Sequence, residues 1–421
     1  MQNQKTIMKT TKFTGQFTCL ALLILTLPAA RGEPFRTDID PALLYYQAFI
    51  LTRNLPETDL DYLLTTNWQG QKLPERFGTL VSNYNAELKL LRQSALQKVS
   101  CDWGIDMSRG PETLLPHLAS AKQAAQGVRL HAMWELQNGN EAEARDDLLA
   151  GLALGRNVSK NSTLISVLVE LAIESIVNTT VAENFHRFSP EMLQQLADGF
   201  AAAPARGTVA ACAPTEKLLH NWKVARIEEL RKQYPGNNAA AMEALHQLVG
   251  SPNLDSRDKD WEQLTNAAGG TLEGVIKLIR DSEPLSMKLG EIMALPHGEY
   301  EDQMQQFTAE VQKSGNPLFS QQLPGWQASR RKEFISMVDS AMVHAAIEYK
   351  LHGEAGLKSV MDPCGNGPFT FQRFVFEGVD RGFELKSVYN RGRGPETYIF
   401  VEKNGPPFYV MGDHAGKPVS P

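Results

Sequence analysis

The sequence contains none of the common motifs of catalysis or nucleotide binding. A G-x-S-x-G elbow, an H-E-x-x-H zinc helix, a P-loop and a dinucleotide-binding fingerprint are all absent. The nine histidines are scattered along the 421 residues without the spacing of metal ligands. These absences remove the sequence evidence for the enzymes that carry such motifs, and we expect no metal and no cofactor.

An excess of basic charge is also lacking. The chain has 42 Lys and Arg against 48 Asp and Glu, a net charge of −6. Nucleic-acid-binding proteins usually present a strongly basic face, so this balance gives no reason to expect a nucleic-acid partner. The hydrophobic share of 42% argues against wholesale disorder, and the length allows a sizeable core in one large domain or in two to three modest ones.

The N-terminal residues have the pattern of a secretory signal peptide. Basic, apolar and small residues follow one another in the expected order: Lys5, Lys9 and Lys12, then Leu20–Leu27, then Ala30 and Gly32. We predict a signal peptide over residues 1–32, cleavage after Gly32 and export to the periplasm or the extracellular space, with no membrane span after cleavage. An uncleaved membrane anchor is the alternative, which the short apolar run and Pro28 disfavour. The choice of start, Met1 or Met8, is open.

Cysteine is scarce. Cys19 lies inside the apolar run and leaves with the signal peptide, so an odd number of thiols remains: Cys101, Cys212 and Cys364. One disulfide and one free thiol are an option in an oxidising compartment, and the pairing is open. No two of the three have metal-ligand spacing.

Helical periodicity dominates the stretch Pro111–Phe188. Apolar residues recur every three or four positions in its first segment, at Leu114, Leu118, Ala121, Ala125, Val128, Ala132 and Leu136. Asn138-Gly139-Asn140 ends this segment, because Gly and Asn tolerate the left-handed conformation of helix ends. A second helix from Glu141 is rich in Ala and Gly, which allow close helix approach. The pair resembles a tetratricopeptide-type hairpin, but no fixed-period repeat is legible, so no regular solenoid is predicted.

A third helix is predicted at Leu164–Ile176. It is nearly all apolar, but Glu170 and Glu174 interrupt it. It is shorter than the ~20 apolar residues that cross a bilayer, so we expect a helix packed in the core.

Proline and capping residues mark the starts of further helices. Before the hairpin, the predicted starts are Pro41, Pro56 and Pro74, the last of these helices running to about Val99. After it, the predicted helices are Ser189–Ala203, Thr215–Tyr234 and less regular ones on to Lys313. We expect residues 33–315 to form an α-helical domain around the central hairpin, 111–188.

The composition changes after a long helix predicted at Gln327–Leu351. Aromatics, Pro and Gly then dominate, and alternation predicts three strands, at Phe369–Phe376, Gly382–Tyr389 and Thr397–Glu402. Asn404-Gly405 is a hairpin signal, and Pro406-Pro407 confines a fourth strand, Phe408–Met411, to a sheet edge. We expect residues 316–421 to form a long helix plus a small antiparallel sheet. The predicted fold class is mainly α: an irregular array of helical hairpins, then a long helix and a small C-terminal antiparallel sheet.

A short C-terminal segment resembles the major pseudopilins of type II secretion. The resemblance rests on Asp362-Pro363-Cys364-Gly365, on Pro368-Phe369-Thr370-Phe371 and on Gly382-Phe383-Glu384-Leu385-Lys386-Ser387. It implies a secretion-system accessory. Two features depart from the family: a prepilin leader is absent, and the place of its calcium loop, Tyr389–Gly394, has no acidic residue, so calcium binding is not implied.

The plan of the whole chain is similar to that of uncharacterised exported bacterial proteins. The shared features follow the signal peptide: a Tyr-Tyr-Gln-Ala-Phe helix from Tyr45, a Pro-His-Leu hairpin from Pro116, Asn316-Pro317-Leu318 before the long helix, and the Asp362–Gly365 turn. This resemblance implies an exported helical protein and no particular activity.

Two pairs of residues are candidates for general acid–base chemistry. Glu170 and Glu174 are four residues apart and share one face of an apolar helix. Burial of two like charges raises the pKa of at least one of them, as a general acid requires. His131 and Glu135 form a similar pair one turn apart. The ordinary interpretation is that these carboxylates form packing salt bridges, with partners among Arg129, Arg145 and Arg156.

The loop around Trp103 offers a second kind of site. Asp102 and Asp106 flank the indole, a combination found in carbohydrate and metal sites. A turn with a helix-capping Asp and a core Trp is the more ordinary interpretation. Two arginines in the turn at Arg391–Gly394 are expected to be solvated.

Two functions are consistent with these features. The first is a non-enzymatic exported scaffold, whose helical body offers grooves to a protein partner in the cell envelope. The second is an envelope hydrolase that uses Glu170 and Glu174 or the Asp102 and Asp106 loop, which requires at least two of these carboxylates to face one cleft. A secretion-system accessory is a third, resting on the pseudopilin-like segment. The oligomeric state is open.

Overall fold

The computed structural model describes residues 38–52, 56–65, 72–161, 163–249, 257–392 and 394–418. The predicted signal peptide, residues 1–32, lies outside the described residues. All helices and strands below belong to one compact unit, Asp40–Pro421.

Short helices precede the central hairpin. They are α2 (Pro41–Leu51), α3 (Glu57–Thr65), α4 (Arg76–Ser82) and α5 (Asn85–Ala95). The starts near Pro41 and Pro56 are confirmed, and the Asp40 carboxylate caps α2 by accepting from the N–H of Ala42 at 2.9 Å. The single helix predicted from Pro74 to Val99 is wrong, because the chain turns at Asn83, a residue type that favours helix ends.

The predicted three-helix stretch is confirmed. It consists of α6 (Pro116–Gln137), α7 (Glu141–Val158) and α8 (Leu164–Glu183). Gly139 makes the turn between the first two with φ +82°. Leu114, predicted on the apolar face, is 78% exposed because α6 begins only at Pro116.

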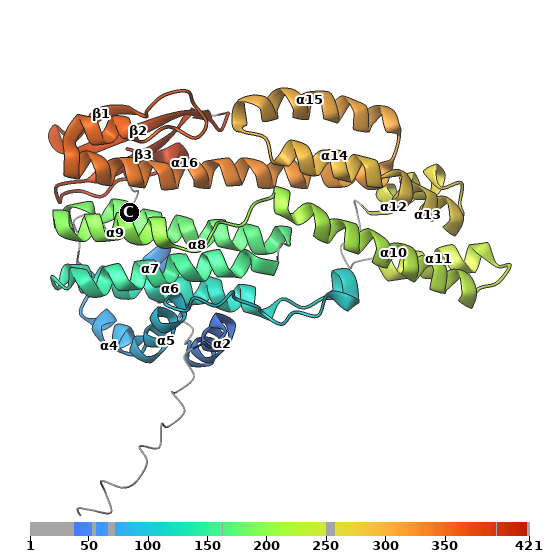
Figure 1. Ribbon diagram of the computed structural model, residues 1–421, viewed down its shortest axis with the longest axis horizontal. Coiled ribbons are helices and arrows are strands. Elements are labelled where there is room, and N and C mark those ends of the chain that lie inside the picture. The colour runs from blue at the N-terminus through green and yellow to red at the C-terminus, as the bar shows by residue number, and fades with distance from the viewer. Residues whose placement is uncertain are drawn as a thin grey trace, which may run out of the picture. The chain divides into compact units, whose positions relative to one another are not determined.

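Helix α8 is longer than predicted and lies at the centre of the fold. It runs to Glu183 rather than Ile176, and Thr163 and Ser166 form a capping box at its start. Its length and composition alone are sufficient to cross a membrane, which corrects the argument from length. In the structure it packs between α7 and α16, as Figure 1 shows. The expectation of a packed core helix is therefore confirmed.

Small residues bring α7 close to its neighbours, as predicted. A Cβ on Gly151 would lie 3.0 Å from Cγ1 of Val128 on α6, and one on Gly155 would lie 3.0 Å from Cγ2 of Ile173 on α8. At these distances an added Cβ would have to displace its neighbour by a few tenths of an ångström, so Gly favours the close approach at both helix crossings.

Among the described residues, seven α-helices lie between α8 and the long helix α16. They are α9 (Pro190–Ala202), α10 (Ala213–Gln233), α11 (Asn238–Val249), α12 (Arg257–Ala267), α13 (Leu272–Asp281), α14 (Glu283–Met293) and α15 (His297–Ser314). The helices predicted at Ser189–Ala203 and Thr215–Tyr234 are confirmed. Helices α10, α11 and α13 share an apolar cluster of their own, which includes Leu230, Leu245 and Ile276.

The long helix α16 (Pro317–Ser359) begins ten residues before its predicted start. Asn316 caps it by accepting from the N–H of Leu318 at 3.1 Å, and Pro317 occupies its first turn. Pro324 lies within the helix rather than before it. Gly353, with φ +65°, interrupts the helix close to its predicted end at Leu351.

The small antiparallel sheet is confirmed, with strand order β1–β2–β3. The strands are β1 (Thr370–Phe376), β2 (Val379–Asn390) and β3 (Pro395–Val401). Glu377 and Gly378, both with positive φ, form the two-residue hairpin loop between β1 and β2. The fourth strand predicted at Phe408–Met411 is not formed: this segment makes isolated bridges, one of them between Met411 and Tyr398 of β3.

The sheet packs on the helical layers through aromatic side chains. Phe383 of β2 and Phe400 of β3 meet the ring of Phe185 edge-on, with centroids 5.9 and 5.4 Å away. In Figure 1 the sheet lies beside α16 at one end of that helix, and α14 and α15 lie beside it toward the other end.

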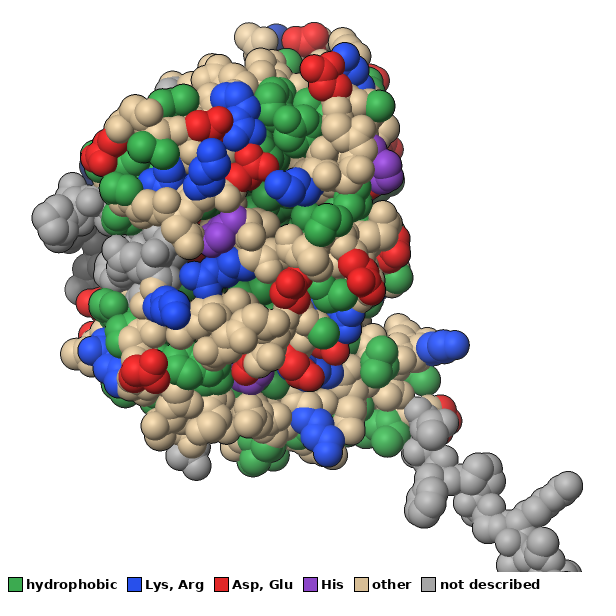
Figure 2. Space-filling model, turned by 90° about the vertical axis from the view of Figure 1, so that its left-hand side faces the viewer, with side chains coloured by type: hydrophobic (Ala, Val, Ile, Leu, Met, Phe, Trp, Pro, Cys, Tyr) green, Lys and Arg blue, Asp and Glu red, His purple; other side chains and the backbone are tan. Residues whose placement is uncertain are grey.

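Charges of both signs are mixed on the surface. On the face shown in Figure 2, Lys and Arg side chains are interspersed with Asp and Glu. Near the sheet, Arg373 pairs with Asp380 at 2.6 Å and with Glu402 at 2.8 Å. Such exposed ion pairs contribute little to stability. Because they mix both signs, this part of the surface has no excess of positive or negative charge.

The close approach of α7 to α8 predicts the effect of a larger side chain. Gly155→Val places two methyl groups against Ile173, and we expect it to lower the free energy of unfolding by about 1–3 kcal/mol. Urea denaturation at 25 °C measures this change. Ala142→Val, on the exposed side of the same helix, is the control and should cost under about 1 kcal/mol. Equal effects of the two substitutions would contradict the close packing.

Candidate functional site

The carboxylates of Glu170 and Glu174 are fully buried between helices. Glu174 forms ion pairs with Arg156 of α7 and, at 2.6 Å, with Arg206 of the segment between α9 and α10. Glu170 accepts from the N–H of Gly207 at 3.0 Å and lies 3.6 Å from Nε of Arg156. The predicted packing salt bridge to Arg156 is therefore present, and Arg206 is a partner that the sequence did not indicate.

These contacts continue into α16. The hydroxyl of Ser336 donates to Glu174 at 2.7 Å, and Arg206 donates to the hydroxyl of Ser340 at 2.9 Å. Between these serines lies Asp339, which is 2% exposed. Its pKa is raised well above the ordinary range by burial, and the neighbouring Glu396 adds to this shift.

Glu396 of β3 has its own cation, Arg391, with which it forms an ion pair. This corrects the expectation that Arg391 is merely solvated. We call the resulting group the buried ionic cluster. Its members are Arg156, Glu170, Glu174, Arg206, Asp339, Arg391 and Glu396.

The pKa values of the cluster suit a general acid, but its position does not. Burial, helped by the charge of Glu174, raises the pKa of Glu170 to about 8, so this carboxyl is mostly protonated at neutral pH. A general acid must come within hydrogen-bonding distance of its substrate. Both glutamates have 0% exposed surface, and their oxygens are engaged by Arg156, Arg206 and Gly207. The geometry is that of a structural link between helices.

His131 and Glu135, the second candidate pair, bind other residues rather than each other. His131 is bound through Nδ1 to Asp147 of α7 at 2.6 Å, and its Nε2 lies 3.2 Å from Asn85 but 3.8 Å from Glu135. Glu135 accepts instead from Asn140 in the hairpin turn, at 2.6 Å. His131 is thus oriented by Asp147, a partner that spacing along one helix does not indicate.

His131 lies beside an open groove of about 480 Å³. We call it the α5–α7 groove. It is lined by Asn85, Leu88, Lys89, Arg92, Gln93, Leu96, His131, Glu135 and Glu143. None of these lining residues is a Ser, Thr or Cys, so the His–Asp pair has no side-chain nucleophile in the groove to activate, and a reaction there would depend on water.

The Trp103 loop has the ordinary structure. The ring of Trp103 is 2% exposed, donates through Nε1 to the carbonyl of Asn157 at 2.8 Å and stacks on His117 at 4.6 Å. Asp102 accepts from the N–H of Gly104 at 2.9 Å, and Asp106 caps the following turn by accepting from the N–H of Ser108 at 2.8 Å. A buried ring offers no face to a sugar, so this loop is a capped turn with a core Trp.

The three cysteine thiols of the described chain are buried or partly buried and have low reactivity. Cys101, Cys212 and Cys364 are free thiols, so the optional disulfide is not formed. Burial raises the pKa of each thiol to about 12, which leaves almost none as the reactive thiolate at neutral pH. Among the described residues, no group of three or more His, Cys, Asp or Glu side chains is placed to hold a metal ion.

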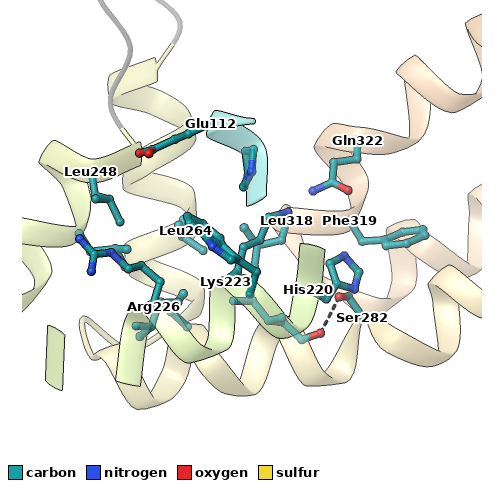
Figure 3. Close-up of a pocket in the computed structure, with 16 residues that line it drawn as sticks. Glu112, His220, Lys223, Arg226, Leu248, Leu264, Ser282, Leu318, Phe319 and Gln322 are labelled. Carbon is teal, nitrogen blue, oxygen red and sulfur yellow. Dashed lines mark hydrogen bonds between the residues drawn. The ribbon is translucent and has the colours of Figure 1, made fainter. Parts of the chain in front are cut away.

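Sequence reasoning missed a cavity of about 370 Å³ beside α10. Its wall is mainly apolar and comes from α10, α11, α12, α13 and α16: Trp222, Ile227, Leu245, Leu248, Leu264, Val275, Ile279, Leu318 and Phe319. In Figure 3, side chains of α10 lie between Leu248 of α11 on one side and Phe319 and Gln322 of α16 on the other. No local signal marks this cavity, because helices distant in sequence form it.

Three basic side chains of α10 line the same cavity. His220 is 9% exposed, and burial lowers its pKa, so the imidazole is neutral at neutral pH. Arg226 is paired with Glu229 at 2.6 Å. Burial lowers the pKa of Lys223, and the charge of Glu216 partly opposes this shift. Of the two cationic side chains in the cavity, Arg226 thus has a carboxylate in direct contact, whereas Lys223 feels a carboxylate only through its charge.

Comparison of the chain with models of known protein families, with curated proteins and with solved structures finds no match. The function is therefore argued from the geometry of the chain itself.

The raised pKa of Glu170 predicts how stability depends on pH. The folded state holds the proton of Glu170 up to a pKa of about 8, whereas the unfolded chain loses it near 4.5. Stability contributed by this proton is present below pH 4.5 and is lost as the pH rises to 8, by about 5 kcal/mol at most. Glu170→Gln has no such proton, so its stability should fall less over this range.

Urea denaturation at pH 5, 6.5 and 8 measures this difference. Glu354→Gln, which changes a side chain that is 81% exposed, is the control and should follow the parent chain. Parallel pH profiles for Glu170→Gln and the parent chain would show that Glu170 is ionised in the folded state.

Proposed function

We propose that the protein is an exported, non-enzymatic binding protein of the cell envelope, whose packed helices present a surface to a protein partner. The observation that carries this proposal is the complete burial of Glu170 and Glu174. Glu174 is thereby committed to ion pairs that hold helices together, and Glu170 to a hydrogen bond from the N–H of Gly207.

Each alternative catalytic group lacks one requirement of catalysis. Glu170 has a suitable pKa but no access to a substrate. His131 is oriented by Asp147, but its groove supplies no side-chain nucleophile. Asp102 and Asp106 are exposed, but they cap turns, and the ring between them is buried. This distribution favours binding over hydrolysis.

Exposed apolar side chains support a protein partner. Large apolar residues of α2 and of the chain around the end of α5 are 42–82% exposed: Leu43, Ile50, Leu51, Leu96 and Val99. Helices α2 and α5 pack against each other. Leu96 also borders the α5–α7 groove, whose other residues are mostly polar. Apolar groups with a polar surround are typical of protein interfaces.

Site-specific photo-crosslinking in the native cells tests this surface. With a photoreactive amino acid at Ile50 or at Leu96, which are 82% and 79% exposed, we expect one and the same envelope protein to be captured at both positions. Leu218 of α10, 64% exposed, is the control position and should not capture it. Absence of an adduct at both test positions, or the same adduct at all three, would contradict a partner at α2 and α5.

Export is tested by the N-terminus of the mature chain. Cleavage after Gly32 predicts that N-terminal sequencing of the exported protein begins at Glu33. Leu23→Arg puts a charge into the apolar run and should leave the uncleaved precursor inside the cell. A membrane-bound protein that retains residues 1–32 would support the anchor instead.

A further inference from the structure

We propose that the cavity beside α10 binds a small amphiphile, a compact apolar chain or ring that carries one anionic group, with Lys223 as the counter-charge. This site is separate from the surface proposed for a protein partner and does not depend on it. Three observations support this proposal: the cavity, a half-buried cation without a direct ion pair, and a buried polar atom that has no hydrogen-bond partner among the described residues.

The cavity has the size and lining of a small-molecule site. About 370 Å³ falls in the range of ligand pockets, which are mostly apolar with a few polar groups. Aliphatic and aromatic side chains form most of the wall, among them Leu245 of α11, Val275 of α13 and Phe319 of α16. Such a wall favours the apolar part of a ligand.

Lys223 distinguishes this cavity from a simple packing gap. Other cations of α10 have carboxylate partners: Lys217 pairs with Glu283 at 2.8 Å, and Arg226 with Glu229 at 2.6 Å. Among the described residues, no ion pair or hydrogen bond involves the ammonium of Lys223, although it is half-buried. A partly buried, unpaired ammonium is costly, and an anionic ligand group supplies the missing charge.

His220 supplies the second polar contact. This side chain is 9% exposed and lines the cavity one turn before Lys223, and its Nδ1 has no hydrogen-bond partner. Buried polar atoms are nearly always paired, so an unpaired ring nitrogen here points to a polar atom of a ligand. A carboxylate held by Lys223 can accept from the neutral imidazole in the tautomer with a proton on Nδ1.

The charges that line the cavity favour a ligand with a single negative charge. Arg226 is neutralised by Glu229, and His220 is neutral because burial lowers its pKa. Two carboxylates, Glu112 at the rim and Glu216 near Lys223, disfavour a polyanion. Within the described chain the ammonium of Lys223 has no direct ion pair and feels Glu216 only through its charge, so it matches one carboxylate better than it matches a phosphate with two charges.

Three probes of equal chain length test the inference. Isothermal titration of the mature chain compares decanoate and decyltrimethylammonium, both below their micelle-forming concentrations, with 1-decanol below its solubility limit. We expect decanoate to bind at least about tenfold more tightly than 1-decanol and the cation not to bind. Equal binding of decanoate and 1-decanol, or no binding of decanoate, overturns the inference.

Variants of α10 identify the residue responsible. Lys223→Gln should weaken decanoate binding about tenfold or more and leave 1-decanol unchanged, whereas Lys223→Arg keeps the charge and should keep most of the binding. Lys217→Gln, one helix face away and already paired with Glu283, is the matched control and should bind like the parent chain. A loss in Lys217→Gln equal to that in Lys223→Gln would show that only surface charge attracts the anion.

Discussion

The buried carboxylate of Glu174 on α8 requires counter-charges, and these come from elements on both sides of the helix. Arg156 approaches Glu174 from α7, and Arg206 approaches it from the segment before α10. The same segment donates its backbone N–H groups to buried carboxylates on both sides, from Gly207 to Glu170 and from Val209 to Glu333 of α16. A buried charge that loses its partner is strongly destabilising, so these contacts fix α7, α8 and α16 relative to one another.

The same electrostatic rule separates structural from functional charges. In the buried ionic cluster Glu174 and Glu396 have Arg partners, whereas burial raises the pKa of Glu170 and of Asp339, so these two carboxyls hold their protons instead. Beside α10, Lys223 lines a cavity and forms no direct ion pair within the part of the chain that the structure describes. We therefore interpret the buried ionic cluster as part of the fold. We interpret the cavity as a site where an anionic ligand group pairs with the ammonium of Lys223. Neither conclusion requires a catalytic step.

Features set by neighbours in sequence could be predicted. The start of α9 follows from a Ser-Pro cap, and the α6–α7 hairpin from apolar periodicity and the Asn-Gly turn. The Glu377–Gly378 hairpin loop and the start of α16 at Pro317 were missed: the sequence pattern predicts the second strand only from Gly382 and the long helix only from Gln327. The partners of the site residues come from distant segments. His131 meets Asp147 of another helix, and Arg206 meets Glu174, which no periodicity within one helix indicates.

The central claim is that Glu174 is structural. The most direct measurement is the free energy of unfolding of Glu174→Gln, together with turnover of envelope polymers by the parent chain. The account predicts a loss of about 3–5 kcal/mol, because Arg156 and Arg206 are left buried without their charge partner, and no turnover. An unchanged unfolding free energy combined with a polymer-cleaving activity that Glu174→Gln abolishes would contradict it and make the cluster an active site.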